Sequence, residues 1–166
     1  YMKNALILLA GGLGKRAGFK EPKQFLKIGN TNLLEYFLSN LDEKLFDIVI
    51  IAIMSKKISA EVKLIQKKYK NLNIKFAKSG KTRQISVKNS LIKLNSYKPL
   101  NVLIHDSARP LASIELIKRI IKNLNKYSSS IPYVIYHDMK KLNNKTLLKK
   151  DKIINIQTPQ GFKFQK

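Results

Sequence analysis

The chain of 166 residues contains no cysteine, which excludes disulfide bonds and metal sites built on thiolates. It also lacks any apolar run of the roughly 18 residues that a membrane-spanning helix needs. The apolar residues 5–10 are too few for a secretory signal and continue directly into a glycine-rich segment. The length is that of one compact domain, and the hydrophobic content of 44% is ordinary for a globular fold. We therefore expect a soluble, cytoplasmic protein with a single domain.

Acidic residues are scarce: ten Asp and Glu stand against 33 Lys and Arg, which gives a formal net charge of +23. Dense positive charge attracts nucleic acids, so a basic nucleic-acid-binding domain is one interpretation. However, 29 of the basic residues are lysines spread along the whole chain, together with many Ile and Asn. That distribution favours compositional drift, because nucleic-acid-binding proteins more often cluster their basic residues and include arginine.

Arginine is rare, and its planar guanidinium is suited to binding phosphates and carboxylates through two hydrogen bonds. Where lysine is the usual base, an arginine therefore suggests a specific need. The four arginines are Arg16, Arg83, Arg109 and Arg119. The first three fall in segments that other signals also select, whereas Arg119 lies on an expected helix and is interpreted as solvent-facing.

Apolar runs alternate with segments of helical period along the chain. Strands are predicted over residues 5–10, 46–54, 74–77, 101–105 and 131–136, and helices over residues 32–41, 59–70, 84–95 and 113–126. Asn32 and Glu35 resemble a capping box, Ser113 is a candidate N-cap, and residues 128–130 are expected to form a turn. The alternation predicts an α/β fold: a Rossmann-like, mostly parallel sheet with helices on both faces.

A glycine-rich loop follows the first predicted strand. It runs through Ala10, Gly11, Gly12, Leu13, Gly14, Lys15 and Arg16. Glycines let backbone amides approach an anion closely, and two basic residues add positive charge at the same place. Since ligands of parallel sheets bind beyond the carboxyl ends of the strands, the loop is a candidate phosphate site.

Several interpretations of this loop compete. A Walker A loop fits poorly, because Arg16 occupies the place of the required hydroxyl residue. The dinucleotide fingerprint fits locally, but Gly18, Pro22 and Gly29 interrupt the helix that it requires, which argues against an NAD(P)-dependent oxidoreductase. Two interpretations remain: a plain turn between a strand and a helix, and a long loop around a nucleoside triphosphate. The three glycines with Lys15 and Arg16 favour the loop around a triphosphate.

Two further segments also begin at or near strand ends. In residues 79–87, Gly80 permits close backbone approach and Ser86 can hydrogen-bond a ligand, although a helix start capped by Thr82 explains the same residues. Asp106 is the only acidic residue between Glu61 and Glu115. A carboxylate at a strand end of this basic protein can hold Mg²⁺ on a triphosphate, and an N-cap or an ion pair with Arg109 is the alternative.

These motifs together resemble a known enzyme family. Residues 9–16, Pro22-Lys23-Gln24, residues 105–110 (His-Asp-Ser-Ala-Arg-Pro) and residues 157–162 (Gln-Thr-Pro-Gln-Gly-Phe) look like the signatures of nucleotidyltransferases that activate sugar and polyol phosphates. The form of these motifs is similar to that of the 2-C-methyl-D-erythritol 4-phosphate cytidylyltransferase family. Ser107 stands where that family has Ala, and residues 137–141 lack a threonine that the family has.

The resemblance implies a role for each matching residue. Arg16 and Lys23 would act on the α-phosphate of CTP, with the nucleotide held by the loop of residues 10–15 and by Gly80, Arg83 and Ser86. Arg109 and Lys152 would bind the acceptor phosphate, and Asp106 would bind Mg²⁺. Residues 137–156 would form an arm that embraces a second subunit, so a homodimer is expected. The family continues beyond residue 166, so we expect a chain truncated at its C-terminus.

The expected reaction converts CTP and 2-C-methyl-D-erythritol 4-phosphate to a CDP-polyol and pyrophosphate in non-mevalonate isoprenoid biosynthesis. Ribitol 5-phosphate or another sugar phosphate is the alternative acceptor. The alternative from another class is the basic nucleic-acid-binding domain, with nucleic acid the less favoured partner.

Overall fold

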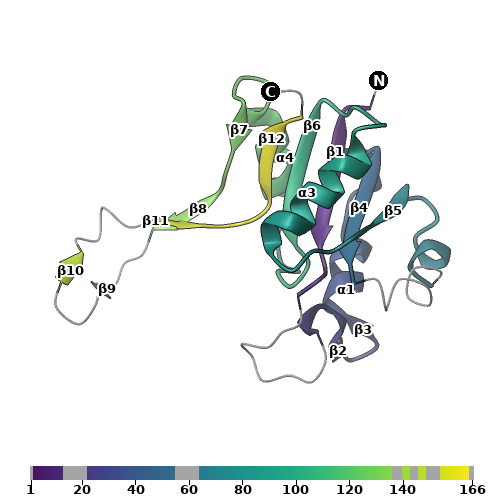
Figure 1. The fold of residues 1–166 in the computed structure, drawn as a ribbon, viewed down its shortest axis with the longest axis horizontal. Helices are drawn as coiled ribbons and strands as arrows, with labels where there is room; N and C mark the ends of the chain where they lie inside the picture. Colours follow the sequence, from purple (N-terminus) through teal and green to yellow (C-terminus); the bar gives the residue numbers. More distant parts are fainter. Residues whose placement is uncertain are drawn as a thin grey trace.

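The computed structural model describes residues 2–12, 22–54, 64–135, 140–142, 146–148 and 154–164. Its centre is a six-stranded sheet in the order β5-β4-β1-β6-β12-β7 (Figure 1). The strands are β1 (Asn4–Leu9), β4 (Ile48–Ile53), β5 (Ile74–Lys78), β6 (Asn101–Asp106), β7 (Ser129–Ser130) and β12 (Gln160–Lys163). The first four in sequence pair in parallel, whereas β12 runs antiparallel to both β6 and β7.

Helices cover both faces of this sheet. Helix α3 (Arg83–Leu94) packs on one face, with Leu94 in a core shared with β1, β4 and β6. Helices α1 (Leu33–Ser39) and α4 (Ile114–Asn123) pack on the other face, together with the helical residues 64–68 (Figure 1). All six residues of β4 are buried, as expected for a parallel strand enclosed between two helical layers. The predicted α/β fold with a mostly parallel sheet is confirmed.

Local capping explains where the helices begin. The Asn32 side chain accepts a hydrogen bond from the Glu35 amide at 2.9 Å, so the predicted N-cap is confirmed, and the Glu35 carboxylate accepts from the Asn32 side-chain nitrogen at 3.0 Å and not from its backbone amide as a capping box would. Ser113 caps α4 through the Leu116 amide, also as predicted. Thr82 caps α3 through the Ile85 amide. These side chains satisfy amides that have no partner inside the helix.

The region after α4 differs from the prediction. Ser129 and Ser130, expected in a turn, form β7 at the sheet edge, and the strand predicted over residues 131–136 contributes no strand to the main sheet. Instead β8 (Tyr133–Ile135) pairs antiparallel with β11 (Ile154–Ile156). The reason is that β12 returns between β6 and β7 and takes the position that a further parallel strand would occupy.

The β8–β11 ribbon projects from the body of the protein (Figure 1). Beyond it, β9 (Lys140–Leu142) and β10 (Thr146–Leu148) form an antiparallel pair. Smaller elements are β2 (Lys27–Ile28) and β3 (Thr31–Asn32), which form a third pair, and the 3-10 turns η2 (Lys23–Phe25) and η3 (Glu43–Leu45). Within the described ranges, no helix is long and apolar enough to cross a membrane.

Candidate nucleotide-binding site

The carboxyl ends of β1 and β6 lie side by side, and the candidate motifs meet there. Leu9, the last residue of β1, is paired in register with Asp106, the last residue of β6. Ser79, which follows β5, lies against Gly11: a Cβ placed on Gly11 would be 2.2 Å from the Ser79 Cβ. The structure therefore brings together one edge of the sheet, the start of the glycine loop and the segment before α3, as the parallel topology predicts.

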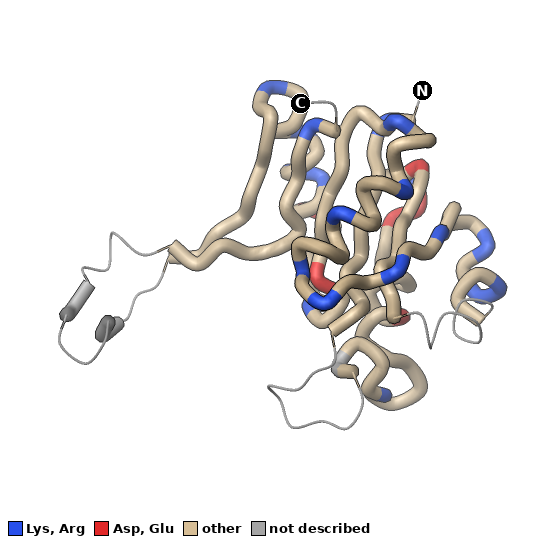
Figure 2. Tube along the Cα trace, in the orientation of Figure 1, with Lys and Arg blue, Asp and Glu red and all other residues tan. Residues whose placement is uncertain are grey.

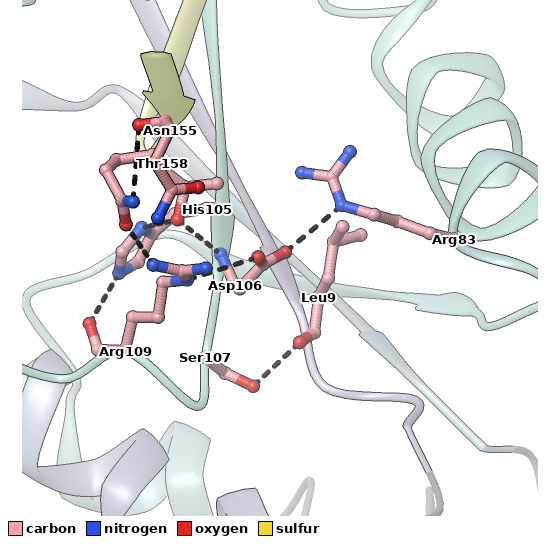
Figure 3. A network of polar contacts seen from close by, with 9 residues as sticks. Leu9, Arg83, His105, Asp106, Ser107, Arg109, Asn155 and Thr158 are labelled. Carbon is pink, nitrogen blue, oxygen red and sulfur yellow. Dashed lines mark hydrogen bonds and ion pairs between the residues drawn. The ribbon is translucent and has the colours of Figure 1, made fainter. Parts of the chain in front are cut away.

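Asp106 lies between two arginines at this edge. One carboxylate oxygen is 3.2 Å from Nε of Arg83, and the other is 3.6 Å from Nε of Arg109 (Figure 3). Arg83 begins α3 and Arg109 lies in the turn after β6, so the two cations come from different elements. The Arg109 guanidinium also donates to the Gln157 side chain. Two positive charges facing one negative charge leave a surplus of positive charge, which favours an anionic ligand.

His105, the residue before Asp106, is completely buried. Its ring Nε2 is 2.9 Å from the Arg109 carbonyl oxygen, and its Nδ1 is 3.0 Å from the Thr158 hydroxyl (Figure 3). Burial lowers the pKa of His105 from 6.5 to about 4, so the ring is neutral at pH 7. Because a carbonyl can only accept, Nε2 carries the ring proton and Nδ1 accepts the Thr158 hydroxyl proton.

This tautomer gives the hydrogen bonds one consistent direction. The Asp106 amide donates to the Thr158 hydroxyl oxygen at 3.4 Å, Thr158 donates to His105, and His105 donates to the Arg109 carbonyl. The Phe37 ring of α1 covers the imidazole at a centroid distance of 4.6 Å. The network therefore joins the strand end that carries Asp106 to the turn that carries Arg109. His105 is inaccessible to substrates, in agreement with a structural role.

Ser107 connects the same strand end to the start of the glycine loop. Its hydroxyl donates to the Leu9 carbonyl at 2.7 Å, and its amide donates to the same oxygen at 3.3 Å (Figure 3). The side chain is buried. The family has alanine at this position, so the Ser107 hydroxyl adds a hydrogen bond between the end of β6 and the end of β1.

Gln24, which follows Lys23 in turn η2, reaches back to the loop. Its side-chain nitrogen donates to the carbonyls of Ala10, at 2.6 Å, and Gly12, at 3.1 Å. Gln24 is buried, whereas Gly12 is exposed: a Cβ placed there would meet no atom of the described residues within 4 Å. The inner side of the loop start is thus held by hydrogen bonds to a buried side chain.

The second segment is held by its own side chains. Ser86 is buried, accepts a hydrogen bond from the Gly80 amide at 2.9 Å and donates to the Thr82 carbonyl at 3.0 Å. A Cβ on Gly80 would lie 2.1 Å from the Ile85 side chain, so only glycine fits. The Ser86 hydroxyl proton is used inside the protein, which leaves a lone pair for a ligand; its contact with a nucleoside stays a prediction.

Several predicted site residues lie outside the described part of the chain. These are Leu13, Gly14, Lys15, Arg16 and Lys152, together with the side chain of Lys23. Their expected roles stay predictions. The backbone of Lys23 is described and lies in turn η2, next to the buried Gln24.

Lysine and arginine positions are distributed over several elements (Figure 2). They occur on α3, on the helical residues 64–68, on α4 and at strand ends, and in the described ranges no single element holds most of them. Arg119 is exposed on α4, as predicted.

The sequence motifs do not indicate the contacts of three residues that complete the site. Thr158 and Gln157 belong to the motif of residues 157–162, but their contacts with His105 and Arg109 span 53 and 48 residues. Gln24 belongs to the motif Pro22-Lys23-Gln24. No local pattern shows which backbone carbonyls a glutamine will reach.

The mostly parallel sheet, the start of a glycine-rich loop at its edge and the carboxylate between two arginines fit an α/β nucleotidyltransferase. The sequence profile of the 2-C-methyl-D-erythritol 4-phosphate cytidylyltransferase family matches residues 4–166. The chain belongs to this family.

Relatives and solved structures agree with this assignment. The 2-C-methyl-D-erythritol 4-phosphate cytidylyltransferase of Thermosipho melanesiensis is 34% identical over 167 residues, which cover 97% of this chain and 73% of that protein. The enzyme of the same name from Clostridium botulinum strain 657 is 36% identical, covering 98% and 73%. The crystal structure of 4-diphosphocytidyl-2C-methyl-D-erythritol synthase from Anaerococcus prevotii superposes with a TM-score of 0.82 at 28% identity, covering 98% of this chain and 72% of that one.

Proposed function

We propose that this protein transfers a cytidylyl group from CTP to 2-C-methyl-D-erythritol 4-phosphate and releases pyrophosphate, a step of non-mevalonate isoprenoid biosynthesis. The observation that carries the proposal is Asp106, held between Arg83 and Arg109 at the edge where the glycine loop begins. The substrates are proposed from the cytidylyltransferase family to which the chain belongs.

The chemistry is an in-line displacement at the α-phosphorus of CTP. An oxygen of the acceptor phosphate forms a bond to that phosphorus, and the bond to the oxygen bridging the α- and β-phosphates breaks, so pyrophosphate leaves with the electron pair. No covalent bond to the protein is needed, and catalysis consists of positioning and charge neutralisation. We assign Arg16 and Lys23 to the charge that develops on the α-phosphate.

The remaining residues divide the substrates between them. The amides of residues 11–14 in the glycine loop would hold the β- and γ-phosphates, with Gly80, Arg83 and Ser86 on the nucleoside side. Arg109 and Lys152 would bind the acceptor phosphate. The two arginines that face Asp106 support phosphate binding at this edge, because both substrates carry phosphate groups.

Mg²⁺ is part of the proposal. In the described part of the chain, no group of three or more acidic, histidine or cysteine residues could hold a metal by itself. Asp106 is a single carboxylate with its side chain 31% exposed, which fits Mg²⁺, an ion commonly held by one or two carboxylates, substrate phosphates and water. Asp106 would hold the ion, which supplies neutralisation of the triphosphate charge.

Release of pyrophosphate tests the reaction directly. The protein should release pyrophosphate with CTP, Mg²⁺ and 2-C-methyl-D-erythritol 4-phosphate, and much less with UTP or ATP. Faster release with ribitol 5-phosphate would favour the alternative acceptor. No release with any pair, together with salt-sensitive binding to duplex DNA, would support the basic nucleic-acid-binding alternative instead.

A charge-removing variant tests the carboxylate. Asp106→Asn should lower kcat/KM by about a hundredfold or more, as found when a single group that stabilises a transition state is removed. Asp47→Asn is the matched control, since Asp47 accepts the Lys3 and Asn4 amides near the start of β1, at the far end of that strand. Equal activity of the two variants would contradict the role of Asp106.

A homodimer in the cytoplasm completes the proposal. The projecting ribbon exposes Tyr133, Val134, Ile135, Ile154 and Ile156, each at 50% or more of its surface. Contiguous exposed apolar residues on a two-stranded ribbon are typical of an interaction surface. Sedimentation velocity should give a dimer for the protein, and Ile154→Lys should shift it toward the monomer. A monomeric wild-type protein at micromolar concentration would contradict this part of the proposal.

A further inference from the structure

The start of the glycine loop has its backbone acceptors turned inward. The carbonyl of Leu9 accepts two hydrogen bonds from Ser107, and the carbonyls of Ala10 and Gly12 both accept from the side-chain nitrogen of Gln24. The Ala10 amide itself donates to the Ala52 carbonyl at 2.8 Å. Every one of these contacts lies on the protein side of the loop.

The direction of the carbonyls fixes the direction of the amides. In a trans peptide the C=O of one residue and the N–H of the next point in opposite directions. Because Gln24 holds the Ala10 carbonyl on the inner side, the Gly11 amide points away from Gln24. Turning the carbonyls inward also removes their lone pairs from the outer side, where they would repel a phosphate.

Gln24 is well suited to this task. Its amide nitrogen has two hydrogens, and the two carbonyls use both. The side chain is only 4% exposed, so it is not available to contact a ligand from solvent. It follows Lys23 directly, so the same anchor holds turn η2 against the base of the loop.

We propose that Gln24 is a positioning residue that sets the orientation of the Gly11 amide for the β- and γ-phosphates of the nucleotide, without touching the nucleotide. This inference rests on the proposed function, because it assumes that the loop holds a triphosphate. It predicts that loss of Gln24 weakens the binding of a nucleoside triphosphate and spares that of the nucleoside monophosphate.

The test compares CTP with CMP in two variants. Gln24→Glu has almost the same shape but replaces the donor nitrogen by an acceptor oxygen, and Gln24→Met removes the donors without adding charge. Both should raise the Kd and KM for CTP roughly tenfold to a hundredfold, the range expected for losing two buried hydrogen bonds. The Kd for CMP and the KM for the acceptor should change less than twofold.

Gln66→Glu is the matched control. Gln66 also donates from its side-chain nitrogen to a backbone carbonyl, that of Ile74 at 3.1 Å, but it lies on the helical residues 64–68 away from the loop. This variant should bind CTP like the wild type. Thermal melting of all three variants shows whether each is folded under the binding conditions.

The outcomes separate the inference from the proposed function. A wild-type protein that binds no CTP with Mg²⁺ refutes the proposed function. Wild-type binding of CTP with an unchanged Kd in both Gln24 variants overturns the inference alone. An equal loss of affinity for CTP and for CMP also overturns the inference, because it shows a structural role for Gln24. A lower kcat with an unchanged KM in a partly unfolded variant overturns it for the same reason.

Discussion

Replacing Thr158 by valine should destabilise the protein, because it leaves the buried ring of His105 without a hydrogen-bond donor. Valine has nearly the same shape as threonine but has a methyl group in place of the hydroxyl. The change removes the donor to His105 Nδ1, at 3.0 Å, and the acceptor of the Asp106 amide, at 3.4 Å. It leaves every other contact of the network in place.

The size of the effect follows from burial. His105 is completely buried, so its Nδ1 cannot turn to water for a new donor. The ring cannot move its proton to Nδ1 either, because Nε2 would then face the Arg109 carbonyl with a lone pair. An unsatisfied buried acceptor costs about 1–3 kcal/mol, and the longer bond from the Asp106 amide adds little. We expect the free energy of unfolding to fall by about 2 kcal/mol.

Urea denaturation at pH 7 measures this change. Thr31→Val is the matched control, because the half-buried Thr31 hydroxyl makes, among the described residues, just a long bond of 3.5 Å to the neighbouring Asn32 carbonyl. The control should change the free energy of unfolding by less than about 0.5 kcal/mol. A Thr158→Val variant as stable as the control would refute both the proposed tautomer of His105 and the cost of leaving it unpaired.

Two further predictions concern pH and the glycine loop. Since burial lowers the pKa of His105 from 6.5 to about 4, the unfolded chain takes up this proton first and stability is lost as pH falls from 6.5 toward 4. Urea midpoints should reveal a loss of about 1 kcal/mol between pH 7 and 5.5, where carboxylates hardly titrate; an unchanged midpoint would contradict it. Gly11→Ala should lower the melting temperature because its Cβ would meet Ser79, costing about 1–3 kcal/mol, whereas Gly12→Ala should leave melting unchanged but weaken CTP binding. Equal melting of the two glycine variants would argue against the packing of the loop on Ser79.

Much of the fold follows from local patterns. The buried strand β4 is a continuous apolar run, β1 and β6 contain shorter ones, and Asn32 and Ser113 begin their helices as their side chains predict. The rule that ligands bind at the carboxyl ends of parallel strands also places Asp106 beside the glycine loop. These features depend on neighbours in sequence or on a general property of the sheet, so the sequence is sufficient to predict them.

The remaining features depend on partners far away in the chain. A run such as Tyr133–Ile135 has the pattern of a strand, but nothing local indicates that it pairs with β11 in a projecting ribbon and not with the sheet. The insertion of β12 between β6 and β7 decides that choice. The contacts of Thr158 follow from the same insertion. The motif that contains Thr158 is therefore visible in the sequence, whereas its hydrogen bond to His105 is not.

The position of β12 also affects the order in which the protein folds. β1 pairs with β6 across 97 residues (Asn4 with Asn101), and β12 pairs with β6 across 56 residues or more (Gln160 with Ile104), so both neighbours of β6 are brought in over long stretches of chain. Contacts of such long sequence separation close late, because the loop entropy is lost before the contact is made. Thr158 precedes β12 and meets His105 only once β12 has docked. We therefore expect the candidate site to be assembled in a late folding step, so that in refolding experiments enzyme activity would return after the helical signal and not together with it.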